Sequence, residues 1–319
     1  MQGRFREPSY KGSESRVTEW GLFLCLLPRH SYPPAVQPLP KDLIESMVKT
    51  ALTEDIGSGD ATTLATVPAS LPARAQMVAR EELIVAGLPV ADSVFKQVDG
   101  SLQVRLRAAE GEQVKAGASL LEVTGRARSI LTAERVAINF VQRLSGIATL
   151  TARFVEAIKG TSAQILDTRK TIPGWRRFEK YAVLCGGGKN HRYDLSDLIL
   201  IKDNHLAALG AESADPIATA VERARRQYPQ LRVEVEADRL EQVAAAVKAG
   251  ADIVLLDNMS LDDIRAAVRM VSGCCRTEAS GGVSLQTVRA IAETGVDFIS
   301  VGALTHSARA VDIGLDFAV

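Results

Sequence analysis

Hydrophobic positions change their spacing along the chain, from short alternating runs to a regular succession of strands and helices. Between residues 75 and 124 the alternation is typical of strands separated by turns. Before this region, the apolar spacing of residues 41–52 predicts a helix, and the Gly- and Asp-rich run 54–60 predicts a turn. The strands predicted here are 76–79, 82–85 and 102–106, which together indicate a small sheet domain.

A helical pattern follows over residues 130–158. Its apolar face is formed by Val136, Ala137, Phe140, Val141 and Leu144. Gly146 interrupts the pattern, and a glycine inside a helix costs about 1 kcal/mol relative to alanine. The sequence therefore predicts two helices that meet at Gly146.

The rest of the chain alternates apolar strands with helices, which indicates a parallel sheet. The predicted strands are 164–167, 198–201, 231–236, 253–256, 276–279 and 298–301. The predicted helices are 216–227, 240–249, 261–271 and 284–294, and Gly250 and Gly295 stand where C-terminal caps belong. No GxGxxG motif opens the first unit, which disfavours a dinucleotide-binding fold. A βα-barrel with fewer than eight strands is favoured.

Composition narrows the function. The 319 residues are enough for two domains. Lys+Arg and Asp+Glu both number 38, which argues against a general nucleic-acid or membrane-surface role. The four cysteines match neither a zinc site nor a disulfide framework, so we expect a reducing, cytoplasmic location. Of these, the adjacent Cys274 and Cys275 are expected at the end of a strand.

Residues 1–38 differ from the remainder because they contain several prolines, among them Pro28, Pro33, Pro34 and Pro38, and lack periodicity. We expect a disordered extension, or translation from a start codon placed too far upstream, without a function of its own. The apolar run Trp20–Leu27 is shorter than the roughly 20 residues of a membrane span. It also lacks a small-residue cleavage site, so neither a membrane segment nor a signal peptide is expected.

Cationic side chains gather where the predicted strands end, which in a βα-barrel is the side of the active site. They are Arg169, Lys170, His191, Arg192 and Lys202. Each alone is accounted for as a solvated loop charge, but together, in a chain without net charge, they predict a local anion site. Guanidinium groups bind carboxylates and phosphates through two hydrogen bonds, and lysine supplies a point charge. The predicted ligands are small and carry several negative charges.

Carboxylates and glycines occupy the remaining strand ends. Glu234, Glu236 and Asp257 either pair with the cations or hold sugar hydroxyls and a divalent cation such as Mg²⁺. The segments 280–282 (Ser-Gly-Gly) and 301–303 (Val-Gly-Ala) end the last two strands, where barrels commonly bind phosphate through backbone N–H groups.

These motifs together resemble the quinolinate phosphoribosyltransferase family, from about Asp42 to the C-terminus. The resemblance rests on EDIGSGDAT (54–62), LTAERVAINFVQRLSGIAT (131–149), DTRKTIPGWR (167–176), GGGKNHR (186–192), IKDNH (201–205), VEVE (233–236), LLDN (255–258), SGGV (280–283) and SVGALTHS (300–307). It implies an N-terminal α/β sandwich and a C-terminal open, incomplete (β/α) barrel of type II phosphoribosyltransferases. The implied domains are 39–145, joined by 305–319, and 146–304.

The resemblance also implies roles for individual residues. Arg135 would reach the quinolinate pocket of a partner chain in a homodimer, and a hexamer is left open. The pocket itself would be formed by Thr168, Arg169, His191, Arg192 and Lys202. Lys170 would face the pyrophosphate, and Glu236, preferred over Glu234, would hold ribose and Mg²⁺ together with Asp257. The 5-phosphate would be bound by Ser280, Gly281, Gly282, Val301, Gly302 and Ala303.

The implied activity is that of a pentosyltransferase of NAD biosynthesis, which joins quinolinate to phosphoribosyl pyrophosphate. A related pyrophosphorylase acting on another base, such as nicotinate, is the nearest alternative. The segment 111–123 also resembles a biotinyl or lipoyl hairpin, but Gly117-Ala118 stands where that hairpin needs a lysine. A sensor that binds without turnover is a third possibility.

Overall fold

The structure, a computed structural model, describes residues 37–210 and 212–318. The prediction for residues 1–38 therefore lies almost wholly outside the described residues, as do Cys25 and the run Trp20–Leu27. The described chain forms a four-stranded antiparallel sheet, a six-stranded parallel sheet and a two-stranded ribbon. This agrees with the predicted α/β class, in which a sandwich precedes a barrel.

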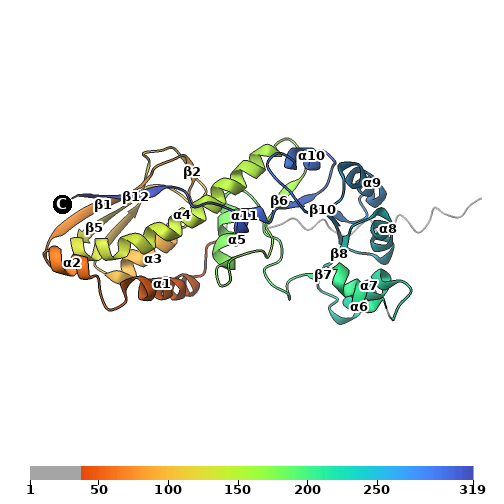
Figure 1. The fold of residues 1–319 in the computed structure, drawn as a ribbon, viewed down its shortest axis with the longest axis horizontal. Coiled ribbons are helices and arrows are strands. Elements are labelled where there is room, and N and C mark those ends of the chain that lie inside the picture. The colour runs from red at the N-terminus through yellow and green to blue at the C-terminus, as the bar shows by residue number, and fades with distance from the viewer. Residues whose placement is uncertain (1–36, 211, 319) are drawn as a thin grey trace, which may run out of the picture. The chain divides into compact units, whose positions relative to one another are not determined.

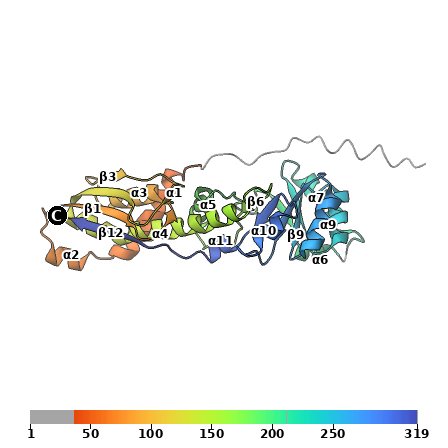
Figure 2. The same cartoon turned by 90° about the horizontal axis from the view of Figure 1, so that it is seen from above.

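The antiparallel sheet has the strand order β12-β1-β5-β3 (Figure 1). Its strands are β1 (Pro72–Ala79), β3 (Gln103–Leu106), β5 (Ser119–Arg126) and β12 (Ile313–Ala318). Helices α1 (Lys41–Ile56), α3 (Leu88–Val98) and α4 (Ala127–Ala157) pack together beside it, and α2 (Ala61–Thr66) contacts α4. The last strand, β12, lies antiparallel beside β1 (Figure 2), so the end of the chain returns to the first sheet.

The parallel sheet has the order β6-β11-β10-β9-β8-β7. Its strands are β6 (Gln164–Leu166), β7 (Ile199–Ile201), β8 (Val233–Ala237), β9 (Ile253–Asp257), β10 (Arg276–Ser280) and β11 (Phe298–Ser300). All six predicted strands are present. β6 and β7 are the two edges and do not pair with each other, so the barrel is open.

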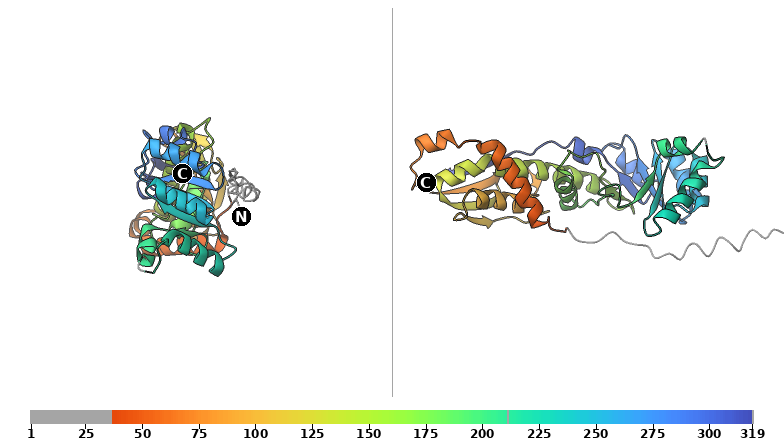
Figure 3. Two further views of the ribbon diagram at one scale, coloured as in Figure 1. Left: turned by 90° about the vertical axis from the view of Figure 1, so that its right-hand side faces the viewer. Right: turned by 90° about the horizontal axis from the view of Figure 1, so that it is seen from below.

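Helices cover the outer face of this sheet (Figure 3). They are α7 (Pro216–Gln227), α8 (Leu240–Ala249), α9 (Leu261–Val271) and the short α10 (Val288–Ala292). Two further helices, α5 (Arg176–Cys185) and α6 (Asp203–Leu209), follow β6 and β7, and α11 (Ala303–His306) follows β11. None of the helices in the described ranges is both long and apolar enough to cross a membrane.

The predicted break at Gly146 is wrong, because α4 runs unbroken for 31 residues. Gly146 instead allows the backbone at Arg309 to pass close to α4. A Cβ atom there would collide with the carbonyl oxygen of Arg309, where the returning C-terminal segment crosses the helix. The loss of helix propensity at one glycine is therefore outweighed by packing along the whole apolar face of α4.

Three smaller expectations also differ from the structure. The run 54–60 is only partly a turn, because α1 continues to Ile56. The last predicted helix is shorter than expected, since Ser284–Thr287 forms a turn before α10. The adjacent cysteines precede β10 rather than end a strand. Gly250 does cap α8 in the left-handed conformation.

The carrier-like segment 111–123 is built into the first domain. Its strand β4 (Gln113–Val114) pairs with β2 (Leu83–Ile84), while β5 pairs with both β1 and β3. A swinging carrier hairpin needs a free tip with a modifiable lysine. The observed pairing therefore removes the biotinyl or lipoyl alternative.

Candidate active site

The carboxyl ends of the parallel strands, called the rim below, carry most of the residues singled out in the sequence. Thr168, Arg169 and Lys170 follow β6, Lys202 follows β7, and Val301, Gly302 and Ala303 follow β11. Glu236 lies in β8, and Asp257 and Ser280 end β9 and β10. Arg135 is separate from them, because it is exposed on α4 within the first domain.

A buried ion pair supports the loop that carries His191 and Arg192. The side chains of Asp167 and Lys180 are fully buried and paired with each other. Asp167 also accepts hydrogen bonds from the Asn190 side chain (2.7 Å) and the His191 backbone N–H (2.8 Å), and Lys180 donates to the His191 carbonyl (3.0 Å). This pair was missed in the sequence, because a lysine within a helix is normally an exposed residue.

Both ring nitrogens of His191 face groups inside the protein, but among the described residues only Nδ1 makes a hydrogen bond. Nδ1 accepts a hydrogen bond from the Arg192 backbone N–H (2.7 Å). Nε2 lies 3.1 Å from Glu234 Oε2 and 3.6 Å from Glu278 Oε1. Burial lowers the pKa of His191, so the ring is neutral at pH 7 and its proton lies on Nε2. His191 is therefore not one of the rim's cations, contrary to the expectation from sequence.

Glu234 and Glu278 form a buried carboxyl pair next to His191. Burial raises the pKa of Glu234 to about 7 and that of Glu278 to about 8. Ser300 donates to Glu278 Oε1, but within the described chain both oxygens of Glu234 and Oε2 of Glu278 have no hydrogen-bond partner. Glu278 was missed, because β10 (Arg-Thr-Glu-Ala-Ser) is polar at most positions and its buried glutamate does not stand out in the sequence. At neutral pH the pair retains a proton.

Two guanidinium groups meet at the rim without a counter-ion. Arg192 makes a hydrogen bond to the Leu198 carbonyl (3.0 Å), while Nε of Arg169 is buried without a partner. Burial and the nearby charge of Arg169 both lower the pKa of Arg192. In the described part of the chain neither guanidinium forms an ion pair. Neighbouring cations of this kind are stabilised by a bound anion.

The two carboxylates on the open side of the rim have different surroundings from the buried pair. Glu236 Oε2 accepts from Lys202 Nζ at 2.6 Å, and Asp257 accepts from the Asn258 side chain at 2.8 Å. β8 and β9 are adjacent, so these carboxylates stand at neighbouring strand ends. Glu234 is fully buried and Glu236 is not, which favours Glu236 as the carboxylate that a ligand can reach.

A third group of residues surrounds Lys170 and Gly302. A Cβ at Gly302 would lie 3.1 Å from both the Lys170 side chain and His306 Nε2, so a larger residue there would require these side chains to shift. The Thr305 hydroxyl donates to the Lys170 carbonyl (2.8 Å). His306 and Thr305 were not singled out in the sequence, although both fall within the SVGALTHS motif. On the neighbouring strand, Gly281 and Gly282 both have positive φ angles of 95° and 58°.

Arg143, in α4, connects the loops of this group to helices α4 and α5. Its guanidinium donates to the carbonyls of Ala308 (2.7 Å) and Thr305 (2.5 Å) and to Glu179 Oε1 (2.6 Å). The other oxygen of Glu179 accepts from the Ile172 backbone N–H (3.1 Å). The segments that follow β6 and β11 are thereby held by one long helix, α4.

Comparison with known proteins identifies the quinolinate phosphoribosyltransferase family. A model of the quinolinate phosphoribosyl transferase N-terminal domain matches residues 60–145, and one of the C-terminal domain matches residues 147–316. The nicotinate-nucleotide pyrophosphorylase [carboxylating] of Mycobacterium leprae is 44% identical over 281 residues, covering 86% of this chain and 97% of that protein. The chloroplastic pyrophosphorylase of Arabidopsis thaliana is 42% identical over 288 residues, covering 85% of this chain and 82% of that protein.

Among solved structures, the nicotinate-nucleotide pyrophosphorylase from Francisella tularensis is similar throughout. It is 41% identical, has a TM-score of 0.84, and the match covers 90% of this chain and all of that one. Sequence and fold therefore agree over both domains.

Proposed function

The chain belongs to the quinolinate phosphoribosyltransferase family, and from this premise we propose how its rim performs the reaction. The reaction joins quinolinate to phosphoribosyl pyrophosphate and yields nicotinate mononucleotide, pyrophosphate and CO2. It is a pentosyltransferase step of NAD biosynthesis.

The arrangement of Arg169 and Arg192 is the observation that carries the substrate assignment. Two adjacent guanidiniums without counter-ions call for a ligand with more than one negative charge. Quinolinate has two carboxylates, and Lys202 and Thr168 complete its pocket. His191 supports the pocket through its backbone and the buried carboxyl pair, because Nδ1 already accepts a hydrogen bond and Nε2 faces Glu234.

Phosphoribosyl pyrophosphate would bind across the other half of the rim. Its 5-phosphate would lie against the backbone of Ser280, Gly281 and Gly282 and of Val301, Gly302 and Ala303, where glycine lets the chain approach oxygen atoms closely. Lys170, beside Gly302, would face the pyrophosphate and stabilise the charge that develops as it leaves.

A divalent cation fits Glu236 and Asp257. They offer carboxylate oxygens at neighbouring strand ends, and Mg²⁺ is commonly held by one or two carboxylates together with substrate phosphates. When bound, Mg²⁺ would neutralise charge on the pyrophosphate. The carboxylates themselves would stabilise the positive charge that develops on the ribose as the bond at C1 breaks.

Catalysis on this scheme depends on position and charge rather than on a covalent nucleophile. The new bond to the ribose makes the pyridine nitrogen cationic. When CO2 departs from the adjacent carbon, the electron pair of the broken bond stays on that carbon, where the cationic nitrogen stabilises it, and a proton from solvent then completes the product. The residues of the rim hold the dianion in place for both steps and exclude water around it.

Assembly and location belong to the same proposal. Arg135 lies in the first domain of its own chain, and in a homodimer it would complete the quinolinate pocket of the partner; a hexamer would be built from such dimers. We propose a cytoplasmic location, as expected from the cysteine content.

The experiment is conversion of quinolinate with phosphoribosyl pyrophosphate and Mg²⁺, with nicotinate assayed in parallel. We expect turnover of quinolinate only, with one CO2 released per nucleotide formed. Turnover of nicotinate without CO2 would instead identify the related pyrophosphorylase. Binding of quinolinate without any turnover would identify a sensor.

A further inference from the structure

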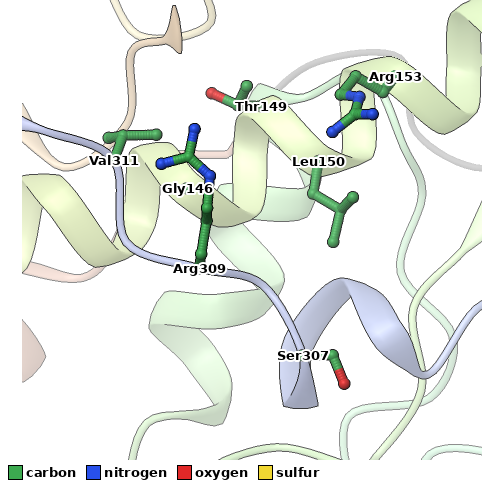
Figure 4. A pocket seen from close by; sticks show the side chains of 7 residues that line it. All are labelled: Gly146, Thr149, Leu150, Arg153, Ser307, Arg309 and Val311. Carbon is green, nitrogen blue, oxygen red and sulfur yellow. The ribbon is translucent and has the colours of Figure 1, made fainter. Parts of the chain in front are cut away.

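A cavity outside the rim lies between α4 and the segment that returns to the first sheet (Figure 4). Its volume is about 250 Å³. One wall is formed by Thr149, Leu150 and Arg153, and the other by Ser307, Arg309 and Val311. Gly146 lies where the two walls meet, at the crossing that requires a glycine. No residue of the proposed reaction lines this cavity.

The polar groups of the cavity are mostly cations and hydroxyls. The charge of Arg309 is balanced by Glu81, to which its guanidinium donates two hydrogen bonds. Arg153 is exposed and, within the described residues, has no ion pair or hydrogen bond. Thr149 already donates its hydroxyl proton to the Ser145 carbonyl (2.6 Å). The cavity therefore retains one uncompensated positive charge on the wall formed by α4, and the Ser307 hydroxyl lies on the opposite wall.

We propose that this cavity is a second binding site for a small phosphate-type anion. An arginine fork and a hydroxyl donor form the usual set for phosphate recognition. The cavity is at or below the lower limit of about 300 Å³ for pockets that bind drug-sized ligands, so a phosphate or pyrophosphate suits it better than a nucleotide. Pyrophosphate is a product of the proposed reaction, and the regulatory part of the inference rests on that reaction.

A direct chain of contacts joins the cavity to the rim. Ser307 Oγ is 2.6 Å from His306 Nδ1, and His306 Nε2 borders Gly302 on the side of Lys170. When Ser307 donates its single proton to an anion, it must accept the Nδ1–H of His306. In the neutral ring, Nε2 then faces the phosphate side of the rim without a proton. Occupation of the cavity thus removes one donor from the phosphate side of the rim.

Binding is tested with inorganic phosphate and pyrophosphate in separate titrations, on the assembled protein with its rim saturated by phosphoribosyl pyrophosphate and without quinolinate. We expect one additional anion per chain. Arg153→Ala should weaken its binding at least about tenfold, the value of one charged hydrogen bond. The matched control is Arg105→Ala, an exposed arginine on β3, which should bind as the wild type does. The anion that binds more tightly, phosphate or pyrophosphate, is then identified as the ligand of the cavity.

Turnover provides the second readout. An anion that competes at the rim does not change kcat at saturating phosphoribosyl pyrophosphate, whereas one in the cavity lowers it, by up to about tenfold for one lost donor. Arg153→Ala should abolish this inhibition, and Ser307→Ala should abolish it while the anion still binds.

The absence of a second anion, or equal binding by Arg153→Ala, would overturn the site. Inhibition that persists in Ser307→Ala would overturn its link to His306. A preparation that binds the second anion but does not convert quinolinate would refute the proposed function alone.

Discussion

Replacing Glu278 with glutamine should change how the stability of the protein depends on pH. Glu278 is fully buried, shares its surroundings with Glu234 and His191, and accepts a hydrogen bond from Ser300. Glutamine has the same shape, still accepts from Ser300, and its amide can donate to the oxygens of Glu234 that have no partner. The variant should therefore fold and differ from the wild type mainly in its protonation.

The magnitude follows from the raised pKa. Folding moves the pKa of Glu278 from 4.5 to about 8, so the folded protein holds this proton more tightly than the unfolded chain. The contribution of Glu278 to stability is complete below pH 4.5 and is lost as the pH rises toward 8, at about 1.4 kcal/mol per pH unit. Between pH 4.5 and 8 the free energy of unfolding falls by at most about 5 kcal/mol through this group. The fall is smaller in practice, because Glu234 titrates together with Glu278 and takes part of the effect.

The assay is urea or thermal unfolding of both proteins at intervals between pH 5 and 8.5. We expect similar stability at pH 5 and a growing advantage for Glu278→Gln at higher pH, about 2 °C in Tm per pH unit. Glu241→Gln, at an exposed position in α8, is the matched control and should show no such divergence. Parallel pH profiles for wild type and Glu278→Gln would refute a proton held by the buried pair.

Four further results are expected. Lys170→Ala should lower turnover about a hundredfold without unfolding the protein, and wild-type rates would contradict its role at the pyrophosphate. Arg135→Ala should be inactive alone but recover about a quarter of wild-type activity when mixed subunits form with Lys170→Ala, because one site per mixed dimer is then intact; no recovery would contradict a shared site. Lys180→Met should cost about 3–5 kcal/mol in urea unfolding, because it leaves Asp167 buried and unpaired, and a smaller loss would mean that Asp167 becomes protonated. Gly146→Ala should lower Tm by several degrees, since the crossing chain must move, and an unchanged Tm would show that it moves freely.

Much of the fold was predictable because the signals are local. Most of the six parallel strands are short, mainly apolar runs, with β10 the polar exception, and the helices α7, α8 and α9 begin and end as their periodicity indicates. The strand ends could also be located, so the rim could be assembled from the rule that parallel strands end at the same edge. Which residues at those ends bind substrate stays a prediction.

The errors arose where distant segments meet. Gly146 was interpreted as a helix break, because the Arg309 carbonyl that requires it is more than a hundred residues away in sequence. His191 was counted as a cation, because its neutral state depends on burial in the folded protein, which the sequence around it does not show. The ion pair of Asp167 and Lys180 was missed although the two residues are only 13 positions apart, because a lysine within a helix is normally exposed.

The sequence by itself determined the alternation of strands and helices, the side of the barrel on which polar residues gather, and, through its motifs, the family. These depend on spacing within a few residues, which backbone geometry converts directly into faces and ends. Only the tertiary structure decided which of the polar residues are charged, which are buried supports and which face a ligand. Those properties are set by burial and by neighbours from other elements, because desolvation and nearby charges, not residue type alone, fix the pKa and partners of a side chain.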